Sequence, residues 1–297
     1  MAYTLRDFGS YTAGGHLAAV TEGTPRKIRF TRQAEYLYDP RGTFAVGHAY
    51  VQYFVPEGTR DRPPVLLVHG GGMSGTTWET TPDDRPGWLH RLLDARRTVH
   101  VIDAVERGRA GFAPGHFDGD PILRSLEEAW SLFRIGPAEG FSARRPYPDS
   151  QFPVATLDAL ARRFVPRWLT TGALQAAALA AVLERLGQAS VLCHSQGAET
   201  LFDAMELAPG RVAAIAAVEP SALPSAPPAA PLLIVAGDRL DIAEHWADRA
   251  AGWRAFAAAP GVRYLDTAAE VAAGGSHLLM MDGHSDDVLS AVLAAGL

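Results

Sequence analysis

Five short runs of apolar residues recur along the chain, and each ends in a turn that carries glycine or a polar side chain. They are PPVLLVHG, RTVHVIDA, ASVLCHS, RVAAIAAVEP and APLLIVAGD, at 63–70, 97–104, 189–195, 211–220 and 230–238. Short continuous apolar runs of this kind suit strands that are buried on both faces of a mostly parallel sheet. A further segment, 42–58, alternates and is rich in β-branched and aromatic residues, which predicts a strand or hairpin arm.

Helical patterns separate these runs, at 87–97, 170–188, 195–210 and 284–297. Thr171 is placed to cap the second helix and Gly187 to end it, while Pro209 and Gly210 end the third. Ser285 is the expected N-cap of the last helix, with two acidic residues in its first turn. Strands that alternate with helices favour an α/β fold, in which helices flank a central sheet. We expect one domain over residues 1–297.

Residues 111–172 interrupt this alternation. They contain no strong strand pattern but several aromatic residues: Trp130, Phe133, Phe141, Tyr147, Phe152, Phe164 and Trp168. The segment is too long to be a plain connection in a compact domain. We expect a helical insertion that caps the functional site, with Trp130, Phe133, Phe152 and Trp168 as candidate lining or core residues. A peripheral helical decoration is the alternative.

Composition narrows the classes of function. The chain has 297 residues, a net charge of −6 and 47% hydrophobic residues, which is ordinary for a globular protein and gives no basic footprint for nucleic acid. No run approaches the 18 apolar residues of a membrane span. Cys193 is the single cysteine, which fits a reducing compartment, and the N-terminal residues do not resemble a signal peptide. We expect a cytoplasmic location, and secretion after removal of a leader is the alternative. The sequence leaves the oligomeric state open, with a homodimer among the alternatives.

The pentapeptide Cys193–His194–Ser195–Gln196–Gly197 carries the main chemical signal. It has the G-x-S-x-G pattern of a nucleophile elbow, with cysteine in place of the first glycine. Its position between an apolar run and a helix favours a nucleophilic Ser195 at a sharp turn over a serine that merely caps the helix. Cys193 is small enough for such a turn. His194 occupies the variable position, where we expect it to pack.

A second signal is the glycine-rich stretch LLVHGGGMSG at 66–75. Backbone N–H groups of such a loop can converge on a developing oxyanion, one from Gly71 or Gly72 and the other from Gln196. The stretch lacks the G-K-[ST] ending of a P-loop and the spacing of a dinucleotide site. His69 is expected to brace the loop.

A general base must follow Ser195, because the chain order in this architecture is serine, acid, histidine. His277 lies in AAGGSHLLMMDG, between a predicted strand at 262–267 and the last helix, where a loop can bring its ring to Ser195. His284 directly precedes that helix and is the alternative. His245 lies in a helical stretch and is expected to face solvent.

Two carboxylates could orient the histidine. Glu219 ends an almost wholly apolar run, and a buried carboxylate needs a partner such as a histidine N–H. Asp238 ends the next run, but a polar turn can account for it. The physical argument favours Glu219 slightly and leaves Asp238 open.

With these residues in place, the chain resembles an α/β-hydrolase, and more narrowly a small group of bacterial serine esterases typified by an Alcaligenes enzyme. The resemblance extends from residue 42 onward and rests on HGGGMSGTTWETTPDDRPGW, VIDAVERGRAG, HSQG, VEP and GGSHLLMMD. It implies Glu219 as the acid, His277 as the base, and Gly71 and Gln196 as oxyanion donors. The chain departs from the group's pattern at Cys193, and two glycines occupy 71 and 72.

The combined expectation is a carboxylic-ester hydrolase that acts on a small-molecule ester through an acyl-enzyme on Ser195, without metal or organic cofactor. One alternative keeps this triad but cleaves a lactone, thioester, amide or carbon–carbon bond. Another is a hydrolase scaffold that binds a ligand without turnover.

Overall fold

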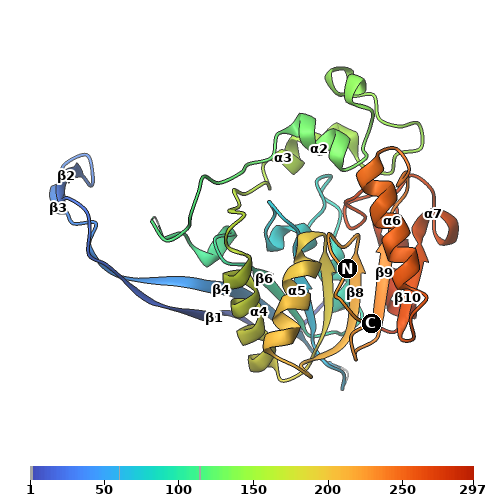
Figure 1. The fold of residues 1–297 in the computed structure, drawn as a ribbon, viewed down its shortest axis with the longest axis horizontal. Helices are drawn as coiled ribbons and strands as arrows, with labels where there is room; N and C mark the ends of the chain where they lie inside the picture. The colour runs from blue at the N-terminus through green and yellow to red at the C-terminus, as the bar shows by residue number, and fades with distance from the viewer. Residues whose placement is uncertain (1–2, 60, 114) are drawn as a thin grey trace.

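A computed structural model of the chain describes residues 3–59, 61–113 and 115–297. Its core is an eight-stranded sheet (Figure 1). In spatial order the strands are β1 (Leu5–Val20), β4 (Gly42–Pro56), β6 (Val99–Asp103), β5 (Val65–Val68), β7 (Ala189–His194), β8 (Val212–Val218), β9 (Leu232–Ala236) and β10 (Val262–Asp266). The pairs β1–β4 and β4–β6 are antiparallel and all other pairs are parallel. The predicted mostly parallel sheet is therefore confirmed.

Helices cover both faces of the sheet. Those over one face are α4 (Gly172–Leu186), α5 (Gln196–Leu207) and α6 (Glu244–Phe256), and those over the other are α1 (Trp88–Asp94) and α8 (Ser285–Ala294). A short α7 (Thr267–Glu270) follows β10. Alternate residues of the buried strands enter two separate apolar clusters, one under each layer of helices. This packing explains why the central strands are apolar along their whole length.

The first strand was not anticipated from the sequence. β1 pairs with β4 along nearly its whole length, and the two form a ribbon that leaves the sheet (Figure 1). At its tip lies a small hairpin of β2 (Arg26–Arg29) and β3 (Glu35–Tyr38). The predicted arm at 42–58 thus corresponds to β4, and its partner is β1.

The helix ends agree with the predicted capping and terminating residues, with one correction. Gly187 ends α4 with φ of 76°, and α5 ends before Pro209. Thr171 is the N-cap of α4, although its side chain makes no capping hydrogen bond. Ser285 is the first residue of α8 and His284 is its N-cap, so the predicted cap is wrong by one residue. Two aspartates do lie in the first turn of α8.

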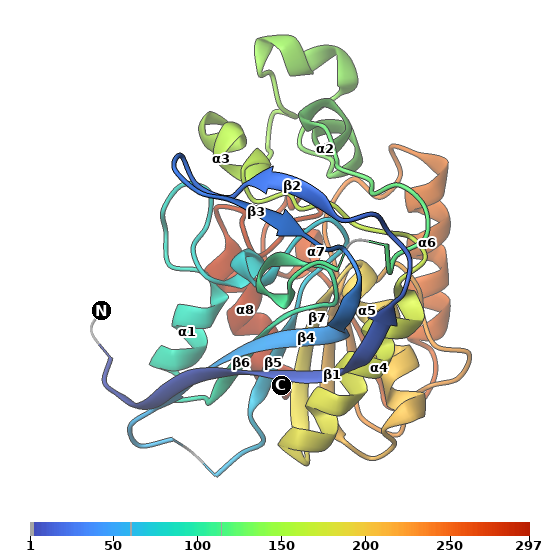
Figure 2. The ribbon, with the colours of Figure 1, turned by 90° about the vertical axis from the view of Figure 1, so that its left-hand side faces the viewer.

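In the described parts of segment 111–172, at 111–113 and 115–172, the helical pieces are all short. These are α2 (Leu126–Leu132), η3 (Ala138–Ala143), η4 (Val154–Thr156) and α3 (Leu157–Ala161); two further 3-10 turns, η1 (Gly75–Trp78) and η2 (Gly108–Ala110), lie earlier in the chain. Both α2 and α3 lie beyond one end of the sheet (Figure 1, Figure 2). That end is the carboxyl end of the parallel strands, because the segment bonds there: Val165 N–H donates to Gly72 O at 2.9 Å, and His277 N–H donates to Phe133 O at 2.9 Å. Within the described ranges, no helix is long and apolar enough to cross a bilayer.

Candidate active site

Ser195 occupies the turn between β7 and α5. Its φ of 50° lies in the left-handed region, which a non-glycine residue adopts only at a cost. The turn is fixed by backbone bonds: Ser195 N–H donates to Val218 O at 3.0 Å, and Ser221 N–H donates to Ser195 O at 3.1 Å. A side chain at Gly197 is excluded, because its Cβ would lie 2.4 Å from the carbonyl oxygen of His69. The Ser195 side chain makes no capping bond to α5, so its hydroxyl remains available.

The two residues before Ser195 support this turn. Cys193 is fully buried, and its thiol lies 3.7 Å from the carbonyl oxygen of Ala216. His194 was expected to pack, and its ring centroid lies 4.6 Å from that of His277. His194 Nε2–H donates to the carbonyl oxygen of His277 at 2.9 Å. Burial holds the pKa of His194 well below its ordinary value, so the ring is a neutral support for the neighbouring histidine.

The glycine-rich loop after β5 is braced as expected by His69. Its Nδ1–H donates to Gly70 O at 2.9 Å, and its Nε2 accepts from Ala104 N–H at 3.1 Å. Burial lowers the pKa of His69 to about 4, and the neutral ring can therefore both donate and accept.

Gly71 and Gln196 line the same cavity as Ser195. Among the described residues, neither backbone N–H has a hydrogen-bond acceptor. Gly72 differs because it does not line the cavity. Gly71 and Gln196 therefore offer two free donors beside Ser195.

His277 and Glu219 form a hydrogen-bonded pair. His277 Nδ1–H donates to Glu219 Oε2 at 2.6 Å. The imidazole packs against the rings of Phe133 and Trp246, with centroid distances of 5.3 and 5.0 Å. Burial lowers the pKa of His277, and the nearby carboxylate offsets part of that effect. Its Nε2 is bonded to no described residue, and the ring lines the cavity that Ser195 lines.

Glu219 is fully buried directly after β8, with φ of 46°. Its Oε1 accepts from Gly237 N–H at 2.7 Å and from Arg134 Nη2. Burial alone would raise the pKa of Glu219, but the charge of Arg134 and the bond from His277 outweigh it and lower the pKa to about 2. Glu219 is therefore an anion that holds the imidazole in one tautomer.

Arg134 is a site residue with no recognisable signal of its own in the sequence. It is fully buried, its Nε–H donates to Asp238 O at 2.7 Å, and its guanidinium lies 4.3 Å from the Trp246 ring centroid. The one available signal was that a buried glutamate requires a cation, but nothing in the sequence pointed to an arginine in the irregular segment 111–172.

The alternative acid, Asp238, has other partners, and the alternative base, His284, does not line the cavity. Asp238 accepts from the backbone N–H groups of Arg239 and Gly274, at 2.6 and 2.8 Å, and thereby shapes the loop that carries His277. The ring of His284 is buried at the start of α8 and does not line the cavity. His245 is exposed on α6, as expected. Ser195 and His277 line the same cavity and Glu219 is bonded to His277, whereas Asp238, His245 and His284 do not line that cavity.

The cavity over Ser195 has a volume of about 240 Å³. Of the four aromatic residues proposed as lining, only Phe133 lines it. Trp130 and Phe152 are buried in the core instead, and Trp168 stacks on Phe112 with centroids 5.0 Å apart. Trp130 and Phe152 thus occupy the core alternative, whereas Trp168 is half-buried and neither lines the cavity nor lies in the core.

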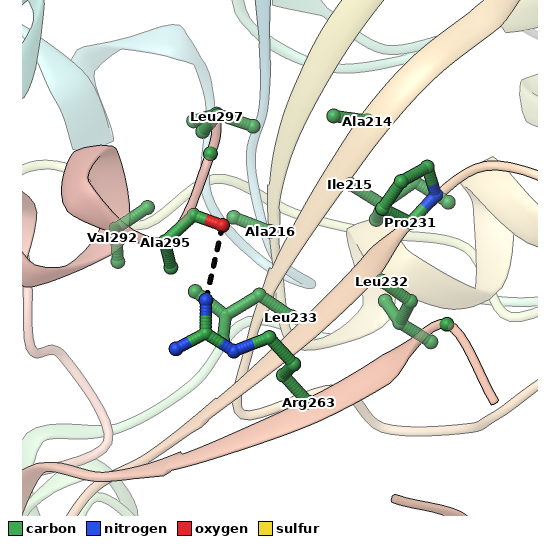
Figure 3. A pocket seen from close by; sticks show the side chains of 12 residues that line it. Ala214, Ile215, Ala216, Pro231, Leu232, Leu233, Arg263, Val292, Ala295 and Leu297 are labelled. Atoms are coloured by element: carbon green, nitrogen blue, oxygen red, sulfur yellow. Dashed lines mark hydrogen bonds between the residues drawn. The ribbon is translucent and has the colours of Figure 1, made fainter. Parts of the chain in front are cut away.

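A smaller hollow of about 40 Å³ lies at the opposite, amino end of β8, β9 and β10 (Figure 3). Its walls are mostly aliphatic, and Arg263 Nη1 donates to Ala295 O at 3.2 Å. None of the described residues that line it is a nucleophile. Within the described part of the chain there is also no group of three His, Cys, Asp or Glu residues that could hold a metal.

No family model matches the chain. It is similar over its whole length to the solved structure of a bacterial esterase, with a TM-score of 0.87 and 29% identity; the match covers 99% of this chain and 96% of that one. It is also 30% identical over 187 residues to a probable secreted lipase from a fungus, covering 59% of this chain and 50% of that protein. The chain thus spans about half the length of that curated relative. The match to the esterase structure identifies the fold as the α/β-hydrolase fold.

Proposed function

We propose that this α/β-hydrolase chain is a serine carboxylic-ester hydrolase that acts through an acyl-enzyme on a small or medium ester. The observation that carries the proposal is the bond between His277 and the ionised Glu219, in a cavity that Ser195 also lines. The similarity to a bacterial esterase and to a probable lipase supports the same class of reaction.

In the proposed reaction, Ser195 Oγ attacks the ester carbonyl carbon while His277 Nε2 accepts the hydroxyl proton. Glu219 orients the imidazole and stabilises its protonated form. The N–H groups of Gly71 and Gln196 bind the tetrahedral oxyanion, and each such donor contributes about 3 kcal/mol in comparable enzymes. The oxyanion then collapses, and the alcohol leaves with the proton from His277. Water, activated by the same histidine, hydrolyses the acyl-enzyme and releases the acid.

We further propose that residues 111–172 act as a cap on a single domain. Leu132 and Phe133 from this segment line the cavity, and so do Arg124 and Arg167. The segment would therefore shape the binding of the acyl or alcohol group. Lactones, thioesters and amides also react at an attacked carbonyl, and a substrate panel separates them from esters.

The first test is the replacement of Ser195 by alanine. We expect the wild-type protein to release a burst of p-nitrophenol from p-nitrophenyl acetate and to be labelled once by a fluorophosphonate. Ser195→Ala should lose the labelling and about 10⁶-fold of kcat. Ser290→Ala, which removes an exposed hydroxyl on α8, is the matched control and should retain both. Full activity in Ser195→Ala would refute the mechanism, and ligand binding without labelling or turnover in the wild type would support a non-catalytic scaffold.

A further inference from the structure

Among the residues that the structure describes, three arginines line the cavity over Ser195: Arg124, Arg167 and Arg249. The single acidic residue in this described lining is Glu199, which is exposed and accepts from Ser221 Oγ at 3.4 Å. This excess of positive charge is local, because the chain as a whole carries a net charge of −6. A cavity for a plain hydrocarbon ester gains nothing from three guanidinium groups, which are costly to desolvate.

Arg167 lies beside Gly71, the proposed oxyanion donor. Its guanidinium lies against Gly71, where a Cβ would be 3.1 Å from Arg167 Cζ. Its backbone is fixed by reciprocal bonds with Ile122, at 3.0 and 2.8 Å. The side chain itself makes no hydrogen bond or ion pair with any described residue, and its buried Nε lacks a partner. Five donors are thus held at the cavity wall without a protein acceptor.

Arg249 and Arg124 complete the positive wall. Arg249 Cζ lies 5.1 Å from the Trp246 ring centroid, and its guanidinium has no ion pair within the described residues. Arg124 is paired with Glu128, which is largely exposed. Burial, with the charge of Arg124 next in importance, lowers the pKa of Arg167, and this effect agrees with the closeness of the two cations.

We propose that the cavity binds an ester that carries a second, ionised carboxylate, such as the half-ester of a short dicarboxylic acid, and that Arg167 is its principal ligand with Arg249 in support. This inference rests on the proposed esterase function and names its substrate class. A carboxylate satisfies the planar guanidinium through two parallel hydrogen bonds. Because Arg167 adjoins the proposed oxyanion donor Gly71, the carboxylate lies only a few bonds from the reacting carbonyl. The cavity of about 240 Å³ suits a short molecule of this kind.

The test compares methyl hydrogen succinate with methyl succinamate, which has nearly the same shape but a neutral amide in place of the carboxylate. We expect wild-type kcat/KM to favour the charged ester at least 10-fold. In Arg167→Met that preference should fall at least 10-fold, and in Arg249→Met by a smaller factor. Arg167→Lys should keep part of it, because lysine retains the charge without the two-pronged geometry. Arg162→Met removes an exposed arginine from the same segment outside the cavity and should leave the preference unchanged.

Binding to a Ser195→Ala protein separates this inference from the proposed function. Calorimetry should show that this protein binds methyl hydrogen succinate at least 10-fold more tightly than methyl succinamate, and that the additional change Arg167→Met removes the difference. Equal binding and equal hydrolysis of the two esters would overturn the carboxylate site and leave the esterase proposal standing. Selective binding without hydrolysis or fluorophosphonate labelling in the wild type would support the site and overturn the esterase proposal.

Discussion

Glu219 lies between a guanidinium and an imidazole, and its two oxygens serve different partners. Oε1 is held by Arg134 and Gly237, which leaves Oε2 to accept from His277. Arg134 does not line the cavity over Ser195. Its role is to position the carboxylate and to keep it ionised, and through the carboxylate it fixes the histidine ring.

This arrangement predicts different effects for the two candidate acids. Glu219→Gln should lower kcat for p-nitrophenyl acetate by about 10⁴-fold, because a neutral amide no longer stabilises the imidazolium or its tautomer. The same change leaves the buried Arg134 unpaired and should cost about 3–5 kcal/mol in the free energy of urea unfolding. Asp238→Asn is the matched control, since its carboxylate accepts only from loop backbone, and it should change kcat less than about 10-fold. A larger loss of kcat in Asp238→Asn than in Glu219→Gln would overturn the assignment.

The secondary-structure elements that are buried in the sheet or packed between layers could be predicted from the sequence. The strands β5 to β9 and the helices α4 and α5 agree with their patterns, because burial on the sheet or between layers imposes an apolar run or a helical period. β1 could not be predicted in this way. Most of its side chains are partly or fully exposed, it contains Gly9, Gly14 and Gly15, and its backbone bonds to β4 hold it.

The same distinction applies to the site. Ser195 and Glu219 directly follow strands, and Gly71 lies in the turn after β5, so the strand pattern located all three. His277 was located by the chain order that the fold requires. Arg134 and Arg167 lie in the irregular segment 111–172. No period relates their sequence positions to the site, and only the tertiary packing brings Arg134 to Glu219 and Arg167 to the cavity.

The tip of the ribbon formed by β1 and β4 should be dispensable for folding and activity. This tip, β2 and β3, is largely exposed. Because Val20 is paired with Gly42, residues 21–41 can be replaced by an Asn-Gly turn without a change of register. We expect the melting temperature to change by less than about 3 °C, since little apolar surface is lost. Hydrolysis of p-nitrophenyl acetate should be retained. A much larger fall would show that the tip is buried against another surface, such as a second copy of the chain.

At the scale of the whole molecule, several titratable groups are buried in the folded state. Some of them stabilise the fold more at high pH and another stabilises it more at low pH. Burial lowers the pKa of His69 to about 4 and also lowers those of His194 and His277. These histidines stabilise the folded protein at pH values above their ordinary pKa of 6.5. That stabilisation is lost as the pH falls toward their lower pKa values in the folded protein. Asp282 acts in the other direction. Its carboxyl is fully buried, and burial raises its pKa to about 7 although Ser276 donates to both oxygens.

Asp282→Asn isolates this effect, because the histidine contributions are common to both proteins and cancel in the difference. The pKa of Asp282 in the folded protein lies above its ordinary value of 3.8. The stabilisation that the wild-type carboxyl contributes is therefore complete below pH 3.8 and decreases progressively as the pH rises to 7. Asparagine is close in shape to the protonated acid and does not titrate. The stability of the variant relative to wild type should therefore increase by up to about 4 kcal/mol between pH 4 and pH 8. Urea unfolding across this range measures the increase, and Asp241→Asn, at an exposed position, should show a difference that is independent of pH. A constant difference for Asp282→Asn would mean that this carboxyl is ionised in the folded protein at both ends of the range.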